Sequence, residues 1–256
     1  MKHIQSNNFK EVIQSLNDGF RHEASIVRSP EWHAQPNTIL MRELLNVVFS
    51  IKVPDKKDDA EDLFEPNLPW ANLHFKERIS GLPLNPGESY KKWPFYKRDK
   101  EMRNEGEMFS HTYMERYWPT FTNPDTPTKI TMGIRYPYGD LDDMIELLVT
   151  KPETRQAYLP IFFPEDTGAL HGKRIPCSLG YHFILRDGYL HTNYYMRSCD
   201  YIRHFRDDMY LTARLAQYIT MILNLKSGES NKYTVGMLDV HLVSLHIFEH
   251  EVRLLK

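Results

Sequence analysis

A cysteine and an arginine–serine pair are the residues of this sequence best suited to chemistry. Cys177 directly follows Pro176 and opens an apolar run, so a strand could hold its sulfur at a fixed angle to a cleft. A thiolate is a strong nucleophile, and nearby arginines lower the pKa of a thiol. Arg197 and Ser198 lie further on, where a guanidinium and a hydroxyl together can hold a phosphate. The residue types alone also allow a buried structural cysteine and a surface arginine–aspartate pair.

Strands are predicted around both motifs. Residues 159–163, 178–185 and 190–196 are apolar and aromatic, and Asp187-Gly188 between the last two runs is typical of a β-hairpin. Residues 232–248 have a strand-like composition as well. The second half of the chain is therefore predicted to be rich in strands.

Helices are predicted elsewhere. Apolar residues recur at helical spacing in residues 8–20, and residues 207–224 form the clearest helix. Residues 139–150 open with acidic side chains, which suit the positive end of a helix dipole. Thr38 is predicted to cap a helix that runs to about Phe49.

These elements predict one domain over residues 1–256. Residues 53–125 carry charged runs and scattered prolines and fit helices and long loops around this domain rather than a linker. The order of helix, loops, helix, strands, helix and strand predicts an α+β or mixed α/β fold.

Composition excludes several classes of protein. The 256 residues include 32 Lys and Arg against 34 Asp and Glu, and this balance argues against a protein that coats nucleic acid. Two cysteines cannot form a disulfide framework and favour a reducing, cytoplasmic setting. The N-terminus lacks the apolar core of a signal peptide, and the apolar run at 44–51 is too short for a membrane span. The histidines show no zinc-ligand spacing, so no metal site is predicted.

Two segments together, PCSLGYHFILRDG and YYMRSCD, resemble the thymidylate synthase superfamily. In that family a Pro-Cys nucleophile is followed at about this spacing by an Arg-Ser-x-Asp segment. The resemblance covers most of residues 20–250, is strongest over 150–210 and is poor over 53–110. It implies an α+β fold with a large mixed β-sheet packed by helices, in which the sheet forms a homodimer interface.

Other segments extend the resemblance. LMRELLNVVF resembles the family's segment with a functional glutamate, which maps to Glu43, and is expected to be a helix here. PETRQA resembles its phosphate-binding loop and places an arginine at Arg155. GMLDVHLVSLHIF resembles a late strand with a sugar-binding histidine, which maps to His246; His241 is the lesser candidate and fits a packed strand histidine.

Further matches and departures concern single positions. Residues 25–28 match the family's N-terminal phosphate loop, with Arg28 as the ligand, and TYMERYW resembles a segment with Tyr113 and Trp118. The family's second arginine beside Arg155 is Gln156 here. The tyrosine of the family's His-x-Tyr is Phe248, so a hydroxyl that contacts the sugar is missing.

One position decides which base is read. Thymidylate synthases carry an asparagine eight residues after the aspartate of Arg-Ser-x-Asp, and the same count from Asp200 gives Asp208. An amide can both accept from N3–H and donate to the 4-carbonyl of uracil, whereas a carboxyl can accept from the 4-amino group of cytosine and share a proton with N3. Family members with aspartate here act on cytosine nucleotides, above all the deoxycytidylate hydroxymethylases of phages. A one-residue slip would put Asp207 in this role, and both acids also suit a helix N-terminus.

The resemblance implies a mechanism. Cys177 adds to C6 of the pyrimidine, Asp208 stabilises the charge at N3 and the 4-amino group, and C5 takes a one-carbon unit from 5,10-methylenetetrahydrofolate. Glu43 orders the water that serves acid–base steps. The nucleotide's 5′-phosphate is assigned to Arg28, Arg197, Ser198 and, from a second subunit, Arg155; the sugar is assigned to His246 and the pterin to Asp200.

The expected reaction is hydroxymethylation of dCMP to 5-hydroxymethyl-dCMP by a homodimer that binds a pyrimidine nucleoside monophosphate but no nucleic acid or membrane. The sequence ends at Lys256, soon after His246, and so lacks the family's folate-covering segment, which favours attack by water over reduction. The alternatives are a CMP hydroxymethylase, a dCMP C5-methyltransferase, a dUMP hydroxymethylase or thymidylate synthase-like enzyme, and a non-catalytic nucleotide-binding relative. A phage origin, with action in the host cytoplasm, is expected from the same resemblance.

Overall fold

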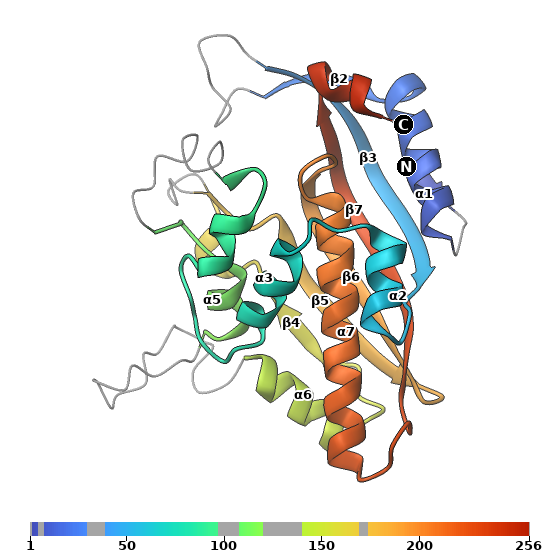
Figure 1. Ribbon diagram of the computed structural model, residues 1–256, viewed down its shortest axis with the longest axis vertical. Coiled ribbons are helices and arrows are strands. Elements are labelled where there is room, and N and C mark those ends of the chain that lie inside the picture. Colours follow the sequence, from blue (N-terminus) through green and yellow to red (C-terminus); the bar gives the residue numbers. More distant parts are fainter. Residues whose placement is uncertain are drawn as a thin grey trace.

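A mixed β-sheet runs through the middle of the computed structural model of the protein (Figure 1). The structure describes residues 2–4, 8–29, 39–96, 108–119, 140–168 and 174–255. The strands in these ranges are β1 (Lys2–Ile4), β2 (Ser25–Ser29), β3 (Ile39–Lys52), β4 (Tyr158–Pro160), β5 (Ser178–Arg186), β6 (Tyr189–Asp200) and β7 (Thr234–Phe248). They pair in the order β1-β3-β7-β6-β5-β4, and β2 also pairs with β3. The β1–β3 and β6–β7 pairs are parallel and the others antiparallel.

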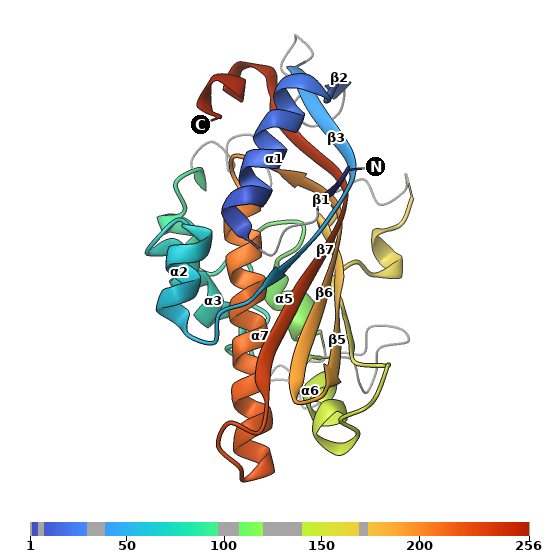
Figure 2. The ribbon, with the colours of Figure 1, turned by 90° about the vertical axis from the view of Figure 1, so that its right-hand side faces the viewer.

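Helices pack against this sheet. They are α1 (Phe9–His22), α2 (Lys57–Phe64), α3 (Trp70–Arg78), α5 (Tyr113–Tyr117), α6 (Leu141–Thr150) and α7 (Phe205–Ser227), with 3₁₀ turns η1 (Glu88–Lys92), η3 (Pro164–Asp166) and η5 (Glu249–Leu254). Figure 2 shows α1, α2, α3 and α7 on the same side of the sheet. The predicted mixed sheet packed by helices is confirmed and agrees with an α+β fold.

Three helices form where the sequence predicts them. Residues 8–20, 139–150 and 207–224 correspond to α1, α6 and α7. In α1 the apolar stripe of Val12, Leu16 and Phe20 is fully buried, because these side chains lie one helical turn apart on the face toward the sheet. Asn8 caps this helix by accepting a hydrogen bond from the backbone of Lys10.

The predicted hairpin joins β5 to β6. Asp187 and Gly188 have φ values of 50° and 80°, the left-handed pair of a two-residue turn whose twist matches that of the strands. The turn sets Ser178 opposite Met196 at the far end of the hairpin. Cys177 and Arg197 therefore meet where the hairpin strands begin and end.

The helix predicted after Thr38 is wrong. Thr38 itself lies outside the described residues, and the segment that follows is the long strand β3. Met41, Leu44 and Val47 are buried three residues apart, which imitates helical spacing. The step from Leu44 to Val47 arises in a strand because Asn46, at φ 53°, interrupts the alternation of side chains between them. The segment is held by β2 on one edge and β7 on the other.

The segment that was hardest to interpret, residues 53–125, holds α2, α3, η1 and α5 in its described parts, as expected for helices and loops around one core. Their apolar side chains join those of the sheet and of α7 in a single buried cluster. The one-domain organisation stays a prediction that this continuous core supports. No helix in the described ranges is long and apolar enough to cross a membrane.

Candidate functional site

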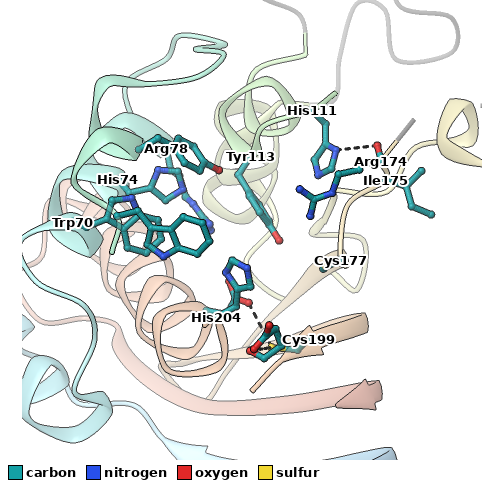
Figure 3. Close-up of a pocket in the computed structure, with 14 residues that line it drawn as sticks. Trp70, His74, Arg78, His111, Tyr113, Arg174, Ile175, Cys177, Cys199 and His204 are labelled. Carbon is teal, nitrogen blue, oxygen red and sulfur yellow. Dashed lines mark hydrogen bonds between the residues drawn. The ribbon is translucent and has the colours of Figure 1, made fainter. Parts of the chain in front are cut away.

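One cavity lies between α3, α5, the start of β5, the end of β6 and the start of α7 (Figure 3). Three of the residues singled out from the sequence line it, namely Cys177, Asp200 and Asp208. Tyr113, from the TYMERYW segment, lines it as well. The remaining lining residues are Trp70, His74, Arg78, Tyr90, Trp93, His111, Arg174, Ile175, Cys199 and His204.

Cys177 is half-buried and is held in place by Arg197. The guanidinium donates from Nε to the carbonyl of Pro176 at 2.8 Å and from Nη2 to the carbonyl of Ile175 at 3.0 Å. The backbone N–H of Arg197 also donates to the carbonyl of Cys177. The planar fork of arginine thus fixes the three residues that end with the thiol and keeps a positive charge beside them.

The two neighbouring acids of α7 face different surroundings. Asp207 accepts hydrogen bonds from the backbone N and the side-chain Nδ2 of Asn67, at 2.7 and 2.8 Å. Asp208 lines the cavity, where the Cys199 thiol donates to its Oδ2 at 3.8 Å. Burial raises the pKa of Asp208 to about 7 and that of Asp207 to about 6. Only Asp208 of the two is placed to meet a ligand in this cavity.

Asp200 is already engaged by its own chain. One oxygen accepts from the backbone N–H groups of Ile202 and Arg203, and the other accepts from the Arg203 guanidinium at 2.6 Å. Burial opposes ionisation, but the Arg203 charge outweighs it and lowers the pKa of Asp200. Arg203 also pairs with Glu251 of η5. The carboxylate expected to meet a pterin is thus one half of a buried ion pair at the edge of the cavity.

Glu43 and His246 meet on adjacent strands. They lie directly opposite each other in the β3–β7 pair, and His246 lies opposite Asp200 in the β6–β7 pair. The Ser198 hydroxyl is 3.4 Å from Nδ1 of His246, and Ser244 donates a hydrogen bond to Glu43. Burial lowers the pKa of His246. Glu43 and His246 therefore lie next to the cavity, on the far side of Asp200, but they do not line it.

The other candidates lie apart. Arg28 on β2 and Arg155 before β4 have exposed side chains outside the cavity. The backbone carbonyl of Arg155 accepts a hydrogen bond from His182. His241 is stacked on Tyr195 with ring centres 5.0 Å apart, as expected for a packed strand histidine.

Sequence reasoning missed the wall that α3 contributes. Trp70, His74 and Arg78 follow one another at intervals of four residues, so they share one face of the helix and all line the cavity (Figure 3). The spacing was the signal that could have found them. Trp118, the other residue of the TYMERYW segment, is buried behind this wall and donates from Nε1 to the Arg78 carbonyl.

Hydrogen bonds fix the proton of His74. The Ser89 hydroxyl donates its hydrogen to the carboxylate of Glu77, so in its 3.2 Å contact with Nδ1 of His74 the same oxygen accepts. Burial lowers the pKa of His74 to about 4, so the ring is neutral at pH 7. Nδ1 therefore carries the proton and Nε2 is a bare acceptor in the cavity wall.

The same wall offers flat apolar surfaces and spare donors. The Trp70 ring stacks on His74 and the Trp93 ring on His204, with ring centres 5.0 and 4.9 Å apart. The indole Nε1 atoms of both tryptophans are buried and have no hydrogen-bond partner. A planar ligand with acceptor atoms suits this surface. Across the described ranges, no group of His, Cys, Asp or Glu side chains is arranged to hold a metal ion.

Comparison with known proteins gives the class to which this fold and site belong. The thymidylate synthase family model matches residues 91–256, which include Cys177, Arg197 and Asp208, and the chain belongs to that family. A protein of Methanothermobacter thermautotrophicus with the name "Putative thymidylate synthase" is 28% identical over 221 residues, which cover 82% of this chain and 79% of that protein. Members of the family are one-carbon transferases that use methylenetetrahydrofolate, bind a pyrimidine nucleotide and act as dimers.

Proposed function

We propose that this protein is a folate-dependent hydroxymethyltransferase that converts dCMP to 5-hydroxymethyl-dCMP. The observation that carries the proposal is that the buried carboxyl of Asp208 shares a cavity with the thiol of Cys177. A carboxyl can accept from the 4-amino group of cytosine while it shares a proton with N3. Because burial raises its pKa to about 7, Asp208 has this proton available at neutral pH.

The reaction begins at Cys177 in this proposal. Its thiolate adds to C6 of the pyrimidine, which makes C5 nucleophilic, while Asp208 lends its proton to N3. Glu43 is half-buried next to His246 and orders the water that removes the C5 proton and later attacks the C5 methylene group.

Side chains at the end of β6 hold the rest of the nucleotide. Ser198 and the Arg197 guanidinium bind the 5′-phosphate, and no hydrogen bond within the described residues occupies Nη1 of Arg197. His246 binds the sugar hydroxyl. Arg28 joins the phosphate site from β2, and Arg155 reaches it from the partner subunit.

The residues beside the nucleotide site fit a reduced folate. 5,10-methylenetetrahydrofolate supplies the one-carbon unit when it is bound. Trp70, Trp93 and His204 would hold its flat ring system, and the unpaired indole N–H groups suit the acceptor atoms of a pterin. Asp200 keeps capacity for one further hydrogen bond, since its contacts with Ile202 and Arg203 use three of about four lone-pair positions.

The face of the sheet away from α7 supports the dimer. Tyr194 and Leu242 point into the core, so their neighbours Tyr195 and Val243 point to the opposite face. Among the described residues, Figure 2 shows no helix over the middle of β6 and β7 on that side, and Val243 is 50% exposed. Pairing two copies through this face would bury it and bring Arg155 toward the partner's cavity.

The test is the mass of the nucleotide product after incubation with methylenetetrahydrofolate and dCMP, dUMP or CMP. Gain of CH₂O on dCMP is expected. Gain of CH₂ would make the protein a methyltransferase, product from dUMP alone would remove Asp208 as the base reader, and product from CMP alone would change the sugar. No product from any of them, with nucleotide still bound, would leave a non-catalytic relative.

A matched pair of variants locates the nucleophile. Cys177→Ser is expected to abolish turnover and to retain nucleotide binding. Cys199→Ser changes the second cysteine of the same cavity and should keep at least about a tenth of the activity, because it retains a donor to Asp208. Equal loss in both variants contradicts the assignment of Cys177 as the sole nucleophile.

A further inference from the structure

We propose that Arg78 is a positioning residue of this reaction: its guanidinium supplies the fixed positive charge against which Asp208 gives up its proton to N3 of cytosine. This inference rests on the proposed function. It assigns a role to Arg78 of α3, which the reaction as outlined above does not use.

Arg78 is a buried cation without an acid of its own. It is the last residue of α3, is 3% exposed and lines the cavity together with Asp208. No carboxylate among the described residues lies within ion-pairing distance of it, and its Nε has no hydrogen-bond partner. The guanidinium carbon lies 3.9 Å from the ring centre of Tyr113, which holds the group in one plane.

The half-buried Arg116 and the buried Arg203 differ from Arg78 in this respect. Arg116 makes a two-pronged ion pair with Asp166, and Arg203 pairs with both Asp200 and Glu251. A buried charge is retained at a cost unless something in its surroundings compensates it. Tyr117, Tyr181 and Tyr113 surround Arg78, and Asp208 is the carboxyl whose charge acts on it.

The groups around Asp208 leave Arg78 as its main counter-charge. Burial and the Asp207 charge raise the pKa of Asp208, and Arg78 is the cation that lowers it. The titratable groups whose ionisation is coupled to that of Asp208 include Tyr113 of α5, Tyr181 of β5, Tyr194 and Cys199 of β6, and Asp207 of α7. Burial raises the pKa of the three tyrosines and of the thiol, so these four stay neutral at pH 7.

The other basic side chains that line the cavity are His74, which is neutral, His111, Arg174 and His204. Arg174 lies beside His111, on the other side of Tyr113 from Arg78, and His204 is stacked on Trp93 (Figure 3). The charge of Arg78 lowers the pKa of Asp208.

The proton transfer moves a charge across the cavity. As the bond from Sγ of Cys177 to C6 forms, the C5=C6 π pair shifts to join C4 and C5, and the C4=N3 pair shifts to N3. N3 then takes the Asp208 proton. The negative charge that the thiolate loses therefore ends on the Asp208 carboxylate, with no oxidant or reductant involved. A fixed cation favours this outcome because it needs no reorganisation when the charge arrives.

The first test needs no substrate, so it stands apart from the proposed function. The full chain is labelled with ¹³C at the aspartate carboxyl groups, and the Asp208 signal is identified by its loss in Asp208→Asn. The wild-type signal should titrate with a midpoint of about 7. Arg78→Met should raise this midpoint by about 1–3 pH units, the effect of removing one nearby opposite charge. An unchanged midpoint in a folded Arg78→Met protein overturns the proposal.

Two variants control this measurement. Arg206→Met removes a cation of α7, the helix that carries Asp208, and this cation pairs with Glu65 outside the cavity. The midpoint of the Asp208 titration should therefore stay at the wild-type value. Arg78→Lys keeps the charge and loses the planar contact with Tyr113, so its midpoint should stay within about half a unit of wild type. If Arg78→Met does not fold, Arg78→Lys decides alone, and a rise of a full unit in it contradicts the charge effect.

The second test measures turnover on dCMP. Arg78→Met should lower kcat at least about tenfold and move the alkaline limb of the pH–rate profile upward together with the Asp208 midpoint. Arg78→Lys should restore most of the rate and the wild-type limb. A merely structural role for Arg78 would lower the amount of active enzyme and leave the limb in place, which would overturn the proposal.

Discussion

The thiol of Cys199 donates a hydrogen bond to the carboxyl of Asp208, with 3.8 Å between Sγ and Oδ2. This contact turns Asp208 toward the end of β6, where the Arg-Ser-Cys-Asp segment lies, and away from Asn67, which holds Asp207. Two adjacent residues of α7 therefore differ in role: Asp207 is held by the backbone and side-chain N–H groups of Asn67, whereas Asp208 lies in the cavity. The predictions about base recognition all depend on this difference.

Asp208→Asn is expected to gain stability relative to wild type as the pH rises. Folding raises the pKa of Asp208 from 3.8 to about 7, so the native protein keeps a proton that the unfolded chain loses between about pH 4 and 7. Ionising this buried carboxyl therefore costs wild-type stability as the pH rises through that window, and asparagine has no such cost. Urea unfolding at pH 5 and pH 8 should show the difference between variant and wild type growing by about 2–3 kcal/mol; a constant difference contradicts it.

The same substitution should change the base that is accepted. An amide at position 208 can accept from N3–H and donate to the 4-carbonyl of uracil, whereas it has no proton to lend to N3 of cytosine. The ratio of kcat/KM for dUMP to that for dCMP should rise by at least about 100-fold in Asp208→Asn. Rates measured for both nucleotides in one series check this, and an unchanged ratio would mean that another residue reads the base.

Asp207→Ala provides the matching contrast. Asp207 is 1% exposed, and its removal leaves the backbone and side-chain N–H donors of Asn67 without their acceptor. We expect a loss of about 1–3 kcal/mol in the free energy of unfolding. The preference for dCMP over dUMP should not move. A change in base preference in this variant would mean that Asp207, and not Asp208 alone, helps to recognise the base.

The parts of the site that the sequence predicts are those with local signals. Cys177 follows a proline at the start of a strand, and Asp187-Gly188 closes the hairpin that brings Arg197 beside it. Both motifs depend on a few adjacent residues and one turn. The resemblance to a family then adds Asp208 by counting from Asp200, over a short turn of four residues between the end of β6 and the start of α7.

The parts that were missed depend on distant pairing or on a cavity. A helix was predicted for Glu43 because Thr38 can cap one and the resembling family segment was expected to be helical, whereas pairing with β2 and β7 makes the segment a strand. The wall of Trp70 and Arg78 was not foreseen because the inner face of α3 meets a cavity rather than the apolar core. Such a face mixes aromatic and charged residues, so the helix lacks the apolar stripe by which surface helices are recognised.

Arg197→Lys should impair both the position of the thiol and nucleotide binding. The guanidinium donates to two successive carbonyl groups, those of Ile175 and Pro176, and a single ammonium group cannot reproduce this fork. We expect kcat on dCMP to fall at least about tenfold and KM to rise, with a loss of roughly 1 kcal/mol in unfolding free energy. Steady-state kinetics and thermal unfolding measure the two effects separately. A rise in KM with kcat unchanged would limit Arg197 to holding the phosphate.

Mixing two inactive variants should restore activity if Arg155 serves the partner's site. Arg155 is exposed and lies outside the cavity of its own chain, whereas Cys177 lines that cavity. In a two-fold dimer, a mixture of Arg155→Met and Cys177→Ser chains forms heterodimers in which one site has lost both residues and the other has both intact. Random pairing of equal amounts makes half of the dimers mixed, so about a quarter of the wild-type activity is expected.

The two variants are mixed, mildly unfolded and refolded together, and each variant refolded alone is the control. Activity no greater than that of the two controls combined would place Arg155 outside the shared site.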